Sequence, residues 1–165
     1  MSGGDERYAF VDHMLAEHRR LDQLVRRALA AIPSWEETDQ PQWLPLMMQG
    51  LSAIRTELAH HFQCEEQGGC LEEAVARCPS LAAEAHSVQR EHDELLEHLD
   101  ALIARCETTS CPSAAKARAV DQELRHVVRE LRLHEVHENR IMQRGFGVCL
   151  EGDALDQQPA TALVE

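Results

Sequence analysis

The sequence predicts an all-α protein, an antiparallel up-down-up-down four-helix bundle. Composition is the first indication, because only 4% of the 165 residues are aromatic and helix-forming Ala, Leu, Glu, Arg and Gln dominate the chain. The second indication is that glycine and proline gather at three breaks, which leave four long stretches with apolar residues at helical spacing. Short connections between long helices favour antiparallel neighbours, so we expect one domain over residues 1–150.

The first expected helix covers residues 7–32 and stops at Pro33. At about 100° per residue, its apolar side chains fall within about 60° of His18, while most of its arginines point elsewhere. His18 therefore lies in the middle of the face that packs into the core. The break that follows holds Trp35 and Trp43, which we expect to cover one end of the bundle.

The second expected helix covers residues 45–66 and ends before Gly68 and Gly69. His61 lies in its apolar stripe, in line with a methionine, an isoleucine and a leucine. Glu65 follows one turn later on the same face. This helix therefore directs an imidazole and a carboxylate into the core.

The third and fourth expected helices repeat this pattern. Residues 80–106 place His92 among leucines and a valine of the apolar stripe, and residues 113–144 place His134 in a stripe of valine, leucine and isoleucine. Glu138 follows His134 by one turn, as Glu65 follows its histidine. Each of the four helices thus has one histidine at the centre of its buried face.

The charge balance and the ends of the chain exclude several classes of function. With 16 Lys and Arg against 29 Asp and Glu, the net charge is −13, which opposes binding to nucleic acid or to an anionic membrane. No apolar run is long enough to span a bilayer, and the first residues do not resemble a secretory signal. We therefore expect a reducing cytoplasm, where disulfides are rare. The six cysteines show no C-x-x-C spacing, so we interpret them as small hydrophobic residues or loop thiols. Residues 151–165 are expected to form a polar, flexible tail.

A weak internal repeat relates the two halves of the chain. Glu17-His18 and Glu91-His92 share the pattern Glu-His-x-x-Leu, and the second and fourth helices share Glu-x3-His-x3-Glu. His92 follows His18 by 74 positions, His134 follows His61 by 73, and Glu138 follows Glu65 by 73. Two similar helical hairpins would bring all of these side chains to one level of the bundle.

Four buried imidazoles and two buried carboxylates predict a metal centre. A single histidine on an apolar face is usually a core residue with a local hydrogen bond, but six polar groups buried without partners would be very costly. Imidazole and carboxylate ligands suit iron, manganese or zinc. Six protein ligands exceed the four of a structural zinc site, so they favour two metals with open positions. The alternative is a polar core that binds no metal.

These motifs resemble the haemerythrin-like family, also called the HHE cation-binding domain. The resemblance covers residues 8–145 and rests on the segments Glu17-His18, His61-Phe62-Gln63-Cys64-Glu65, Glu91-His92 and His134-Glu135-Val136-His137-Glu138-Asn139. It implies a four-helix bundle with a non-haem centre of two iron ions. It further implies that His18, His61, His92 and His134 are iron ligands, and that Glu65 and Glu138 are bridging carboxylates.

The sequence departs from the oxygen-carrying members of that family. Those members have a second histidine one turn after the third-helix histidine, where this chain has Leu96, and they end the motif with Asp at a wider spacing than that of Glu138. The pattern is closer to the six-ligand members, which include iron-sensing and iron–sulfur-repair proteins.

Several residues near the expected centre keep alternative interpretations. His137 is a possible seventh ligand. Glu57 and Glu130 either accept hydrogen bonds from imidazole N–H groups, form an extra metal pair, or are charges on the helix face. Cys64 is either redox-active near the centre or a packing residue. The remaining histidines are expected at the surface: His13, His60, His86, His98 and His126.

The favoured function is a di-iron protein that binds or senses a small ligand such as O2, NO or iron itself. A rival hypothesis is an enzyme with the same centre, which reduces O2 or peroxide or donates iron for iron–sulfur cluster repair. A third is a redox-inert or zinc-filled structural bundle. Open coordination positions serve the first two hypotheses equally.

Overall fold

The computed structural model describes residues 5–32, 43–109 and 113–147, and these residues form helices and no strand. The all-α prediction is therefore confirmed for this part of the chain. The helices are, in chain order, α1 (Asp5–Ala30), α2 (Trp43–Gly68), α3 (Cys70–Arg77), a 3-10 turn (Pro79–Leu81), α4 (Ala82–Glu107) and α5 (Ala114–Phe146).

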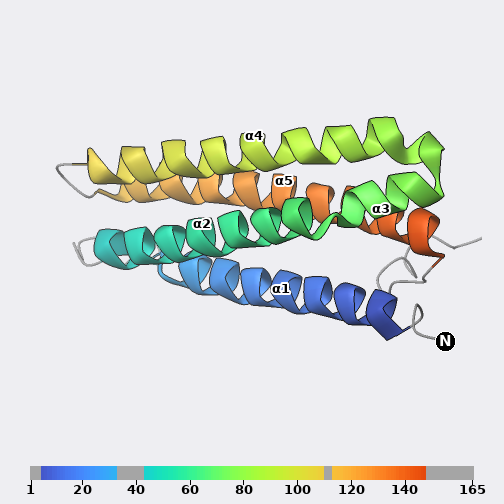
Figure 1. Ribbon diagram of the computed structural model, residues 1–165. Coiled ribbons are helices and arrows are strands. Elements are labelled where there is room, and N and C mark those ends of the chain that lie inside the picture. The colour runs from blue at the N-terminus through green and yellow to red at the C-terminus, as the bar shows by residue number, and fades with distance from the viewer. Residues whose placement is uncertain (1–4, 33–42, 110–112, 148–165) are drawn as a thin grey trace, which may run out of the picture.

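The four long helices α1, α2, α4 and α5 lie side by side, and each runs opposite to the long helix before it (Figure 1). The main packing pairs are α1 with α2, α4 with α5, and α2 with α4. Each corresponds to one of the expected helices and extends slightly beyond the expected bounds at one end or both. Pro45 lies in the first turn of α2, where a backbone N–H has no partner within the helix, so proline is tolerated there.

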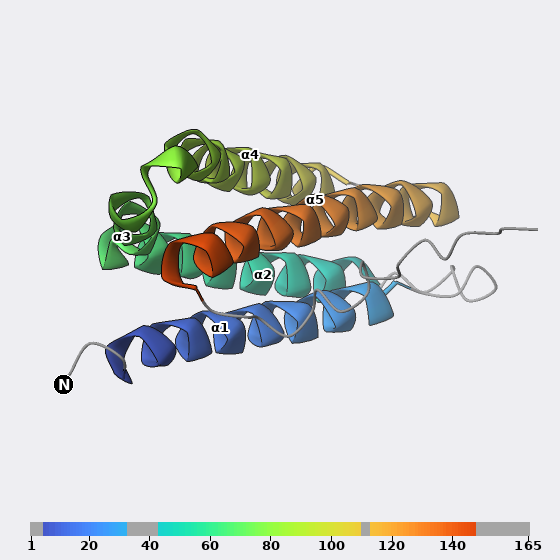
Figure 2. The same cartoon turned by 90° about the vertical axis from the view of Figure 1, so that its right-hand side faces the viewer.

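A fifth helix, α3, occupies a segment that the sequence analysis treated only as a break. Gly69 adopts a left-handed conformation with φ of 66° between α2 and α3, a turn that glycine makes at little cost. α3 then lies beside the C-terminal part of α5 (Figure 2). An ideal Cβ on Gly145 would lie 2.6 Å from the Ala74 Cβ, so this glycine permits the close approach of α3 and α5.

The apolar core is divided along the helix axes. The larger cluster includes Leu21, Leu58, Leu99 and Leu124, and two smaller clusters beneath α3 include Leu71, Ile141, Met14 and Met142. On α1, α4 and α5 the site histidine falls in sequence between the larger cluster and a smaller one, whereas His61 on α2 lies between Leu58 and Phe62 of the larger cluster. The polar groups therefore form a layer with apolar packing on both sides.

The structure also bears on three further expectations. Trp43 is buried at the start of α2 and belongs to the larger cluster, whereas Trp35 lies outside the described residues. The expected tail, residues 151–165, lies outside them as well. Among the described helices, none combines the length and apolarity required to cross a membrane.

Candidate metal centre

The structure brings all six expected site residues together in the interior. α1 carries His18, α2 carries His61 and Glu65, α4 carries His92, and α5 carries His134 and Glu138. Five of them are at most 2% exposed, and His18 is half-buried. Because each side chain lies on the apolar stripe of its helix, helix packing alone is sufficient to collect them.

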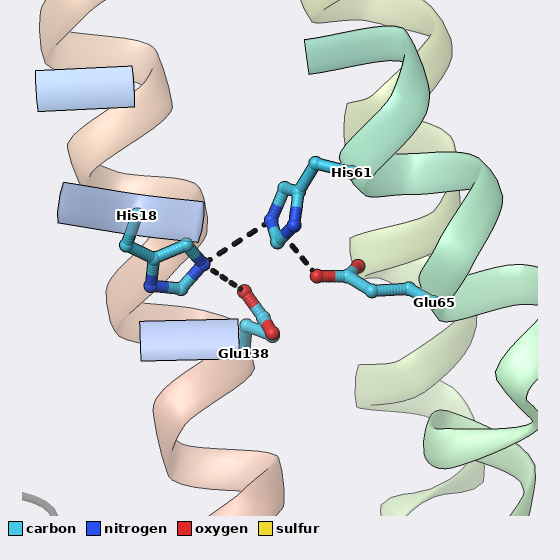
Figure 3. Close-up of side chains that lie close together, drawn as sticks. All are labelled: His18, His61, Glu65 and Glu138. Carbon is cyan, nitrogen blue, oxygen red and sulfur yellow. Dashed lines mark hydrogen bonds and ion pairs between the residues drawn. The ribbon is translucent and has the colours of Figure 1, made fainter. Parts of the chain in front are cut away.

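One group of donors consists of His18, His61, Glu65 and Glu138, whose ligand atoms all lie within 4.8 Å of one another. The His18 Nε2 lies 3.2 Å from the His61 Nε2 and 3.2 Å from the Glu138 Oε2. Figure 3 shows the four side chains pointing toward a common point from α1, α2 and α5. Two imidazoles and two carboxylates therefore surround this point.

A second group consists of Glu65, His92 and His134, again with ligand atoms within 4.8 Å of one another. Glu65 belongs to both groups and directs one oxygen to each. Its Oε1 lies 2.9 Å from the His61 Nε2, and its Oε2 lies 3.3 Å from the His92 Nε2. Glu65 is thus placed between two possible metal positions, whereas Glu138 belongs to the first group alone.

The inward-facing atoms of these groups are buried and form no well-aligned hydrogen bond, although three of the carboxylate oxygens lie close to imidazole Nε2 atoms. The inward-facing atoms are both carboxylate oxygens of Glu65 and of Glu138, and the Nε2 atoms of His92 and His134. Buried polar atoms in folded proteins almost always have a partner, and a missing one costs free energy. A pair of cations would supply the missing partners, so the donor set fits metal ions.

Carboxylates also contact the outward nitrogens of three of the four imidazoles. The His61 Nδ1 donates to Glu17 at 3.0 Å, the His134 Nδ1 to Glu91 at 3.2 Å, and the His92 Nδ1 to Glu66 at 3.1 Å. In the neutral imidazole that binds a metal, a proton held on Nδ1 leaves Nε2 with a free lone pair that faces inward. This arrangement, a carboxylate behind a histidine, is typical of metal-binding imidazoles.

The sequence predicts no role for Glu17, Glu66 and Glu91, although it repeats the Glu-His pair that contains Glu17 and Glu91. In both halves, the Glu of that pair contacts the histidine of the next long helix. Phe62 was not predicted at the site either, and its ring stacks on His92 with centroids 3.9 Å apart and planes 7° from parallel. An aromatic residue directly after the His61 ligand was the available signal.

The two halves of the site are related but not identical. The His18–His61 and His92–His134 rings each meet edge to face, with centroids 4.9 Å apart in both pairs. Phe62 lies beside the second pair, and the repeat puts Glu135 at its equivalent position. The second metal position therefore has a more apolar surrounding than the first.

Burial and the carboxylates set the charges of the site. Burial lowers the pKa of His18 and of His134. Burial also acts on His61, but the carboxylates of Glu65, Glu138 and Glu17 outweigh it and raise the pKa of His61 to about 9.

The pKa values of the two central carboxylates are shifted in opposite directions. Burial would raise the pKa of Glu65, but its contacts with His61 and His92 prevail and hold that pKa well below its usual value. Burial raises the pKa of Glu138, and the neighbouring charge of Glu65 raises it further. Glu65 is thus the ionised partner of the two in the absence of metal.

The residues with open interpretations lie outside the two donor groups. His137 donates to Glu91 at 2.9 Å, and Glu57 pairs with Arg20 at 3.2 Å. Glu130 contacts two histidines that belong to neither group, His98 at 2.8 Å and His126 at 3.3 Å.

The surface histidines lie where they were expected. His13, His60, His86, His98 and His126 are all exposed. Cys64 is half-buried, and its sulfur lies 3.6 Å from the His60 Nε2.

No protein-family model, curated protein or solved structure matches this chain. The resemblance to haemerythrin-like proteins therefore stays a prediction from the sequence motifs.

Proposed function

We propose that this chain is a haemerythrin-like four-helix bundle that binds two iron ions at a carboxylate-bridged centre. The observation that carries the proposal is Glu65, which is shared by two groups of buried donors and has one oxygen directed to each. The unpartnered oxygens and nitrogens around it support the proposal, because a metal pair would satisfy them.

The donor chemistry favours iron. His92, His134 and Glu65 form a set of two imidazoles and one carboxylate, which is typical of non-haem iron sites that keep open positions. His18, His61 and Glu138 complete the other position together with Glu65. Neither group contains a thiolate, so the set has no bias toward soft metals.

A small molecule such as O2 or NO is the ligand that we propose for the open positions. When bound, a pair of iron ions supplies coordination positions and electrons to such a ligand. The chain orients the imidazoles through the carboxylates of Glu17, Glu66 and Glu91. Phe62 and the apolar clusters above and below keep bulk water away from the layer.

A surface cavity borders one donor of the second group. It has a volume of about 200 Å³, lies between α4 and α5, and is lined in part by Glu91, Leu95, Leu133 and His134. His134 is thereby the donor of the second group that borders this cavity. With three protein donors instead of four, the second position is also the one with more room for an added ligand.

Metal analysis with a visible spectrum tests the proposal. Protein expressed in iron-replete medium should contain about two iron ions per chain. We then reduce it without oxygen and add O2 or NO. An adduct that reverses when the gas is removed supports binding or sensing, whereas continued consumption of reductant or peroxide assigns an enzyme. One zinc ion and no iron would refute the di-iron centre.

Single substitutions test the roles of the two central carboxylates. Glu65→Ala should lower the occupancy of both positions, because both groups share this residue. Glu138→Ala should lower the metal occupancy of the first position more than that of the second. His86→Ala is the matched control, because His86 is exposed and should leave the metal content unchanged. Equal loss in the control would mean that the ligands lie elsewhere.

The proposed compartment is the reducing cytoplasm. The described cysteines Cys64, Cys70, Cys78 and Cys106 are free thiols, and thiols persist in that environment.

A further inference from the structure

We propose that the surface of the α1–α2 hairpin carries a separate site for Zn²⁺ or a similar divalent cation. Its ligands are Glu17, His60 and Cys64, and His13 completes the set. This site goes beyond the proposed di-iron function and does not depend on it.

The first three donors already converge. The ligand atoms of Glu17, His60 and Cys64 all lie within 4.8 Å of one another. The Cys64 Sγ lies 3.6 Å from the His60 Nε2, which in turn lies 4.0 Å from the Glu17 Oε1. Donor atoms at these separations from one another can all bind a single ion that lies between them.

Two neighbouring helices present the donors as matched pairs. His13 and Glu17 are four residues apart on α1, and His60 and Cys64 are four residues apart on α2. Residues at this spacing lie on one face of a helix, and α1 and α2 lie side by side (Figure 2). The His13 Nε2 is already 3.3 Å from the Glu17 Oε1, and both histidine side chains are about 60% exposed.

The donor set differs chemically from that of the core. Two imidazoles, one thiolate and one carboxylate make the four tetrahedral ligands that Zn²⁺ prefers. The sulfur biases the set toward zinc and similar metals, whereas the core donors contain no sulfur. The carboxylate of Glu17 touches both environments, because Oε2 accepts from His61 while Oε1 faces His13 and His60.

The second hairpin provides an internal comparison. The repeat places Ser87, Glu91, Leu133 and His137 at the positions equivalent to His13, Glu17, His60 and Cys64. That half therefore lacks the thiolate and keeps a single imidazole, at another position. The converging donors on α1 and α2 are a feature of one hairpin and are not a consequence of the repeat.

Cobalt titration of the full-length protein tests this site. Co²⁺ bound to a thiolate gives a near-ultraviolet charge-transfer band, which the sulfur-free core donors cannot produce. We expect this band to appear up to one Co²⁺ per chain, and to disappear when Zn²⁺ is added. Cys64→Ser should abolish it, and His60→Ala should weaken Co²⁺ affinity at least about tenfold, as expected when a metal site loses a supporting group.

Cys78→Ser is the matched control, because Cys78 is also a free, half-buried thiol but lies outside the donor group. It should keep the full band. No thiolate band at saturating Co²⁺ would overturn the proposal. So would a band that survives in Cys64→Ser or that Cys78→Ser abolishes, and far-ultraviolet circular dichroism checks that each variant is folded.

Discussion

At the scale of single residues, the proton on each imidazole decides which nitrogen can bind a metal. Glu91 accepts from the His134 Nδ1 with one oxygen and from the His137 Nδ1 with the other. It therefore fixes the tautomer of one proposed ligand while it also holds a residue outside both donor groups. Substituting Glu91 and His137 one at a time distinguishes their roles in metal binding.

We predict that Glu91→Gln weakens metal binding at the second position by about 10–100-fold, the usual effect of losing a carboxylate behind a histidine ligand. The amide keeps the size of the side chain but can present an N–H to Nδ1. Chelator competition with the iron-loaded protein measures the change.

His137→Ala is the control and should change the affinity little, because His137 belongs to neither donor group. A loss of one metal position in His137→Ala would show that this histidine is a seventh ligand.

His61 leads to a prediction about protons. Its pKa of about 9 means that the metal-free protein keeps His61 protonated at neutral pH, whereas metal binding requires the lone pair. Anaerobic Fe²⁺ titration by calorimetry, in buffers of different ionisation enthalpy, should therefore show release of about one proton or more at about pH 7.

The raised pKa of His61 determines how proton release and Fe²⁺ affinity change with pH. His61 loses its proton as the pH rises through about 9, so proton release should fall and Fe²⁺ affinity should rise over that interval. His18 and His134 have lowered pKa values and are already neutral at pH 7. An affinity that does not change between about pH 7 and pH 10 would contradict a protonated His61.

The sequence was sufficient to place the six expected residues on inward faces, because helical phase depends only on position along the chain. The sequence was not sufficient to predict that Glu17 contacts His61. Glu17 precedes His18 by one position and is turned about 100° away on the same helix, so its contact with His61 depends on how α1 packs on α2. Predicting a contact between two helices requires their packing geometry, and the residue pattern of a single helix does not contain that information.

At the scale of elements, the long helices were predictable and α3 was not. Periodicity accumulates over many turns, so the four long helices show clear stripes. α3 spans eight residues, and a segment of two turns between glycines and a proline resembles an ordinary connection. Its helical form depends on the packing of Leu71 and Ala74 beneath it.

We predict that Gly145→Ala destabilises the protein by about 1–3 kcal/mol, the range for an overpacked core. The added Cβ would lie 2.6 Å from the Ala74 Cβ and 2.8 Å from the Ala74 Cα, so α3 must move. This loss outweighs the gain from helix propensity, which is at most about 1 kcal/mol because Gly145 lies in the last turn of α5. Urea unfolding measures the change.

Gly50→Ala is the comparison variant. Its Cβ would meet the Ala28 Cβ at 3.0 Å, a milder contact that small shifts relieve, so we expect a smaller loss. A Gly145→Ala protein as stable as the original would mean that α3 does not pack on α5 in this way.

At the scale of the whole molecule, the polar layer interrupts a core that is otherwise apolar. The larger cluster and the two smaller ones are complete without the site residues, so the helices can pack without metal. The unpartnered atoms of Glu65, Glu138, His92 and His134 nevertheless disfavour that state. Metal binding at the proposed centre would therefore affect the stability of the fold more than its helical content.

We predict that metal-free protein keeps its far-ultraviolet circular dichroism but unfolds at a lower temperature. A ligand that binds only the folded state adds about 2.7 kcal/mol when its concentration is 100 times its dissociation constant. For a domain of this size, that corresponds to a shift in Tm on the order of 5–10 °C. Glu65→Ala should show little of this response, because both donor groups lose a ligand. Identical melting curves with and without iron would mean that the buried histidines do not hold a tightly bound centre, and that the layer is a polar core stabilised by its own hydrogen bonds.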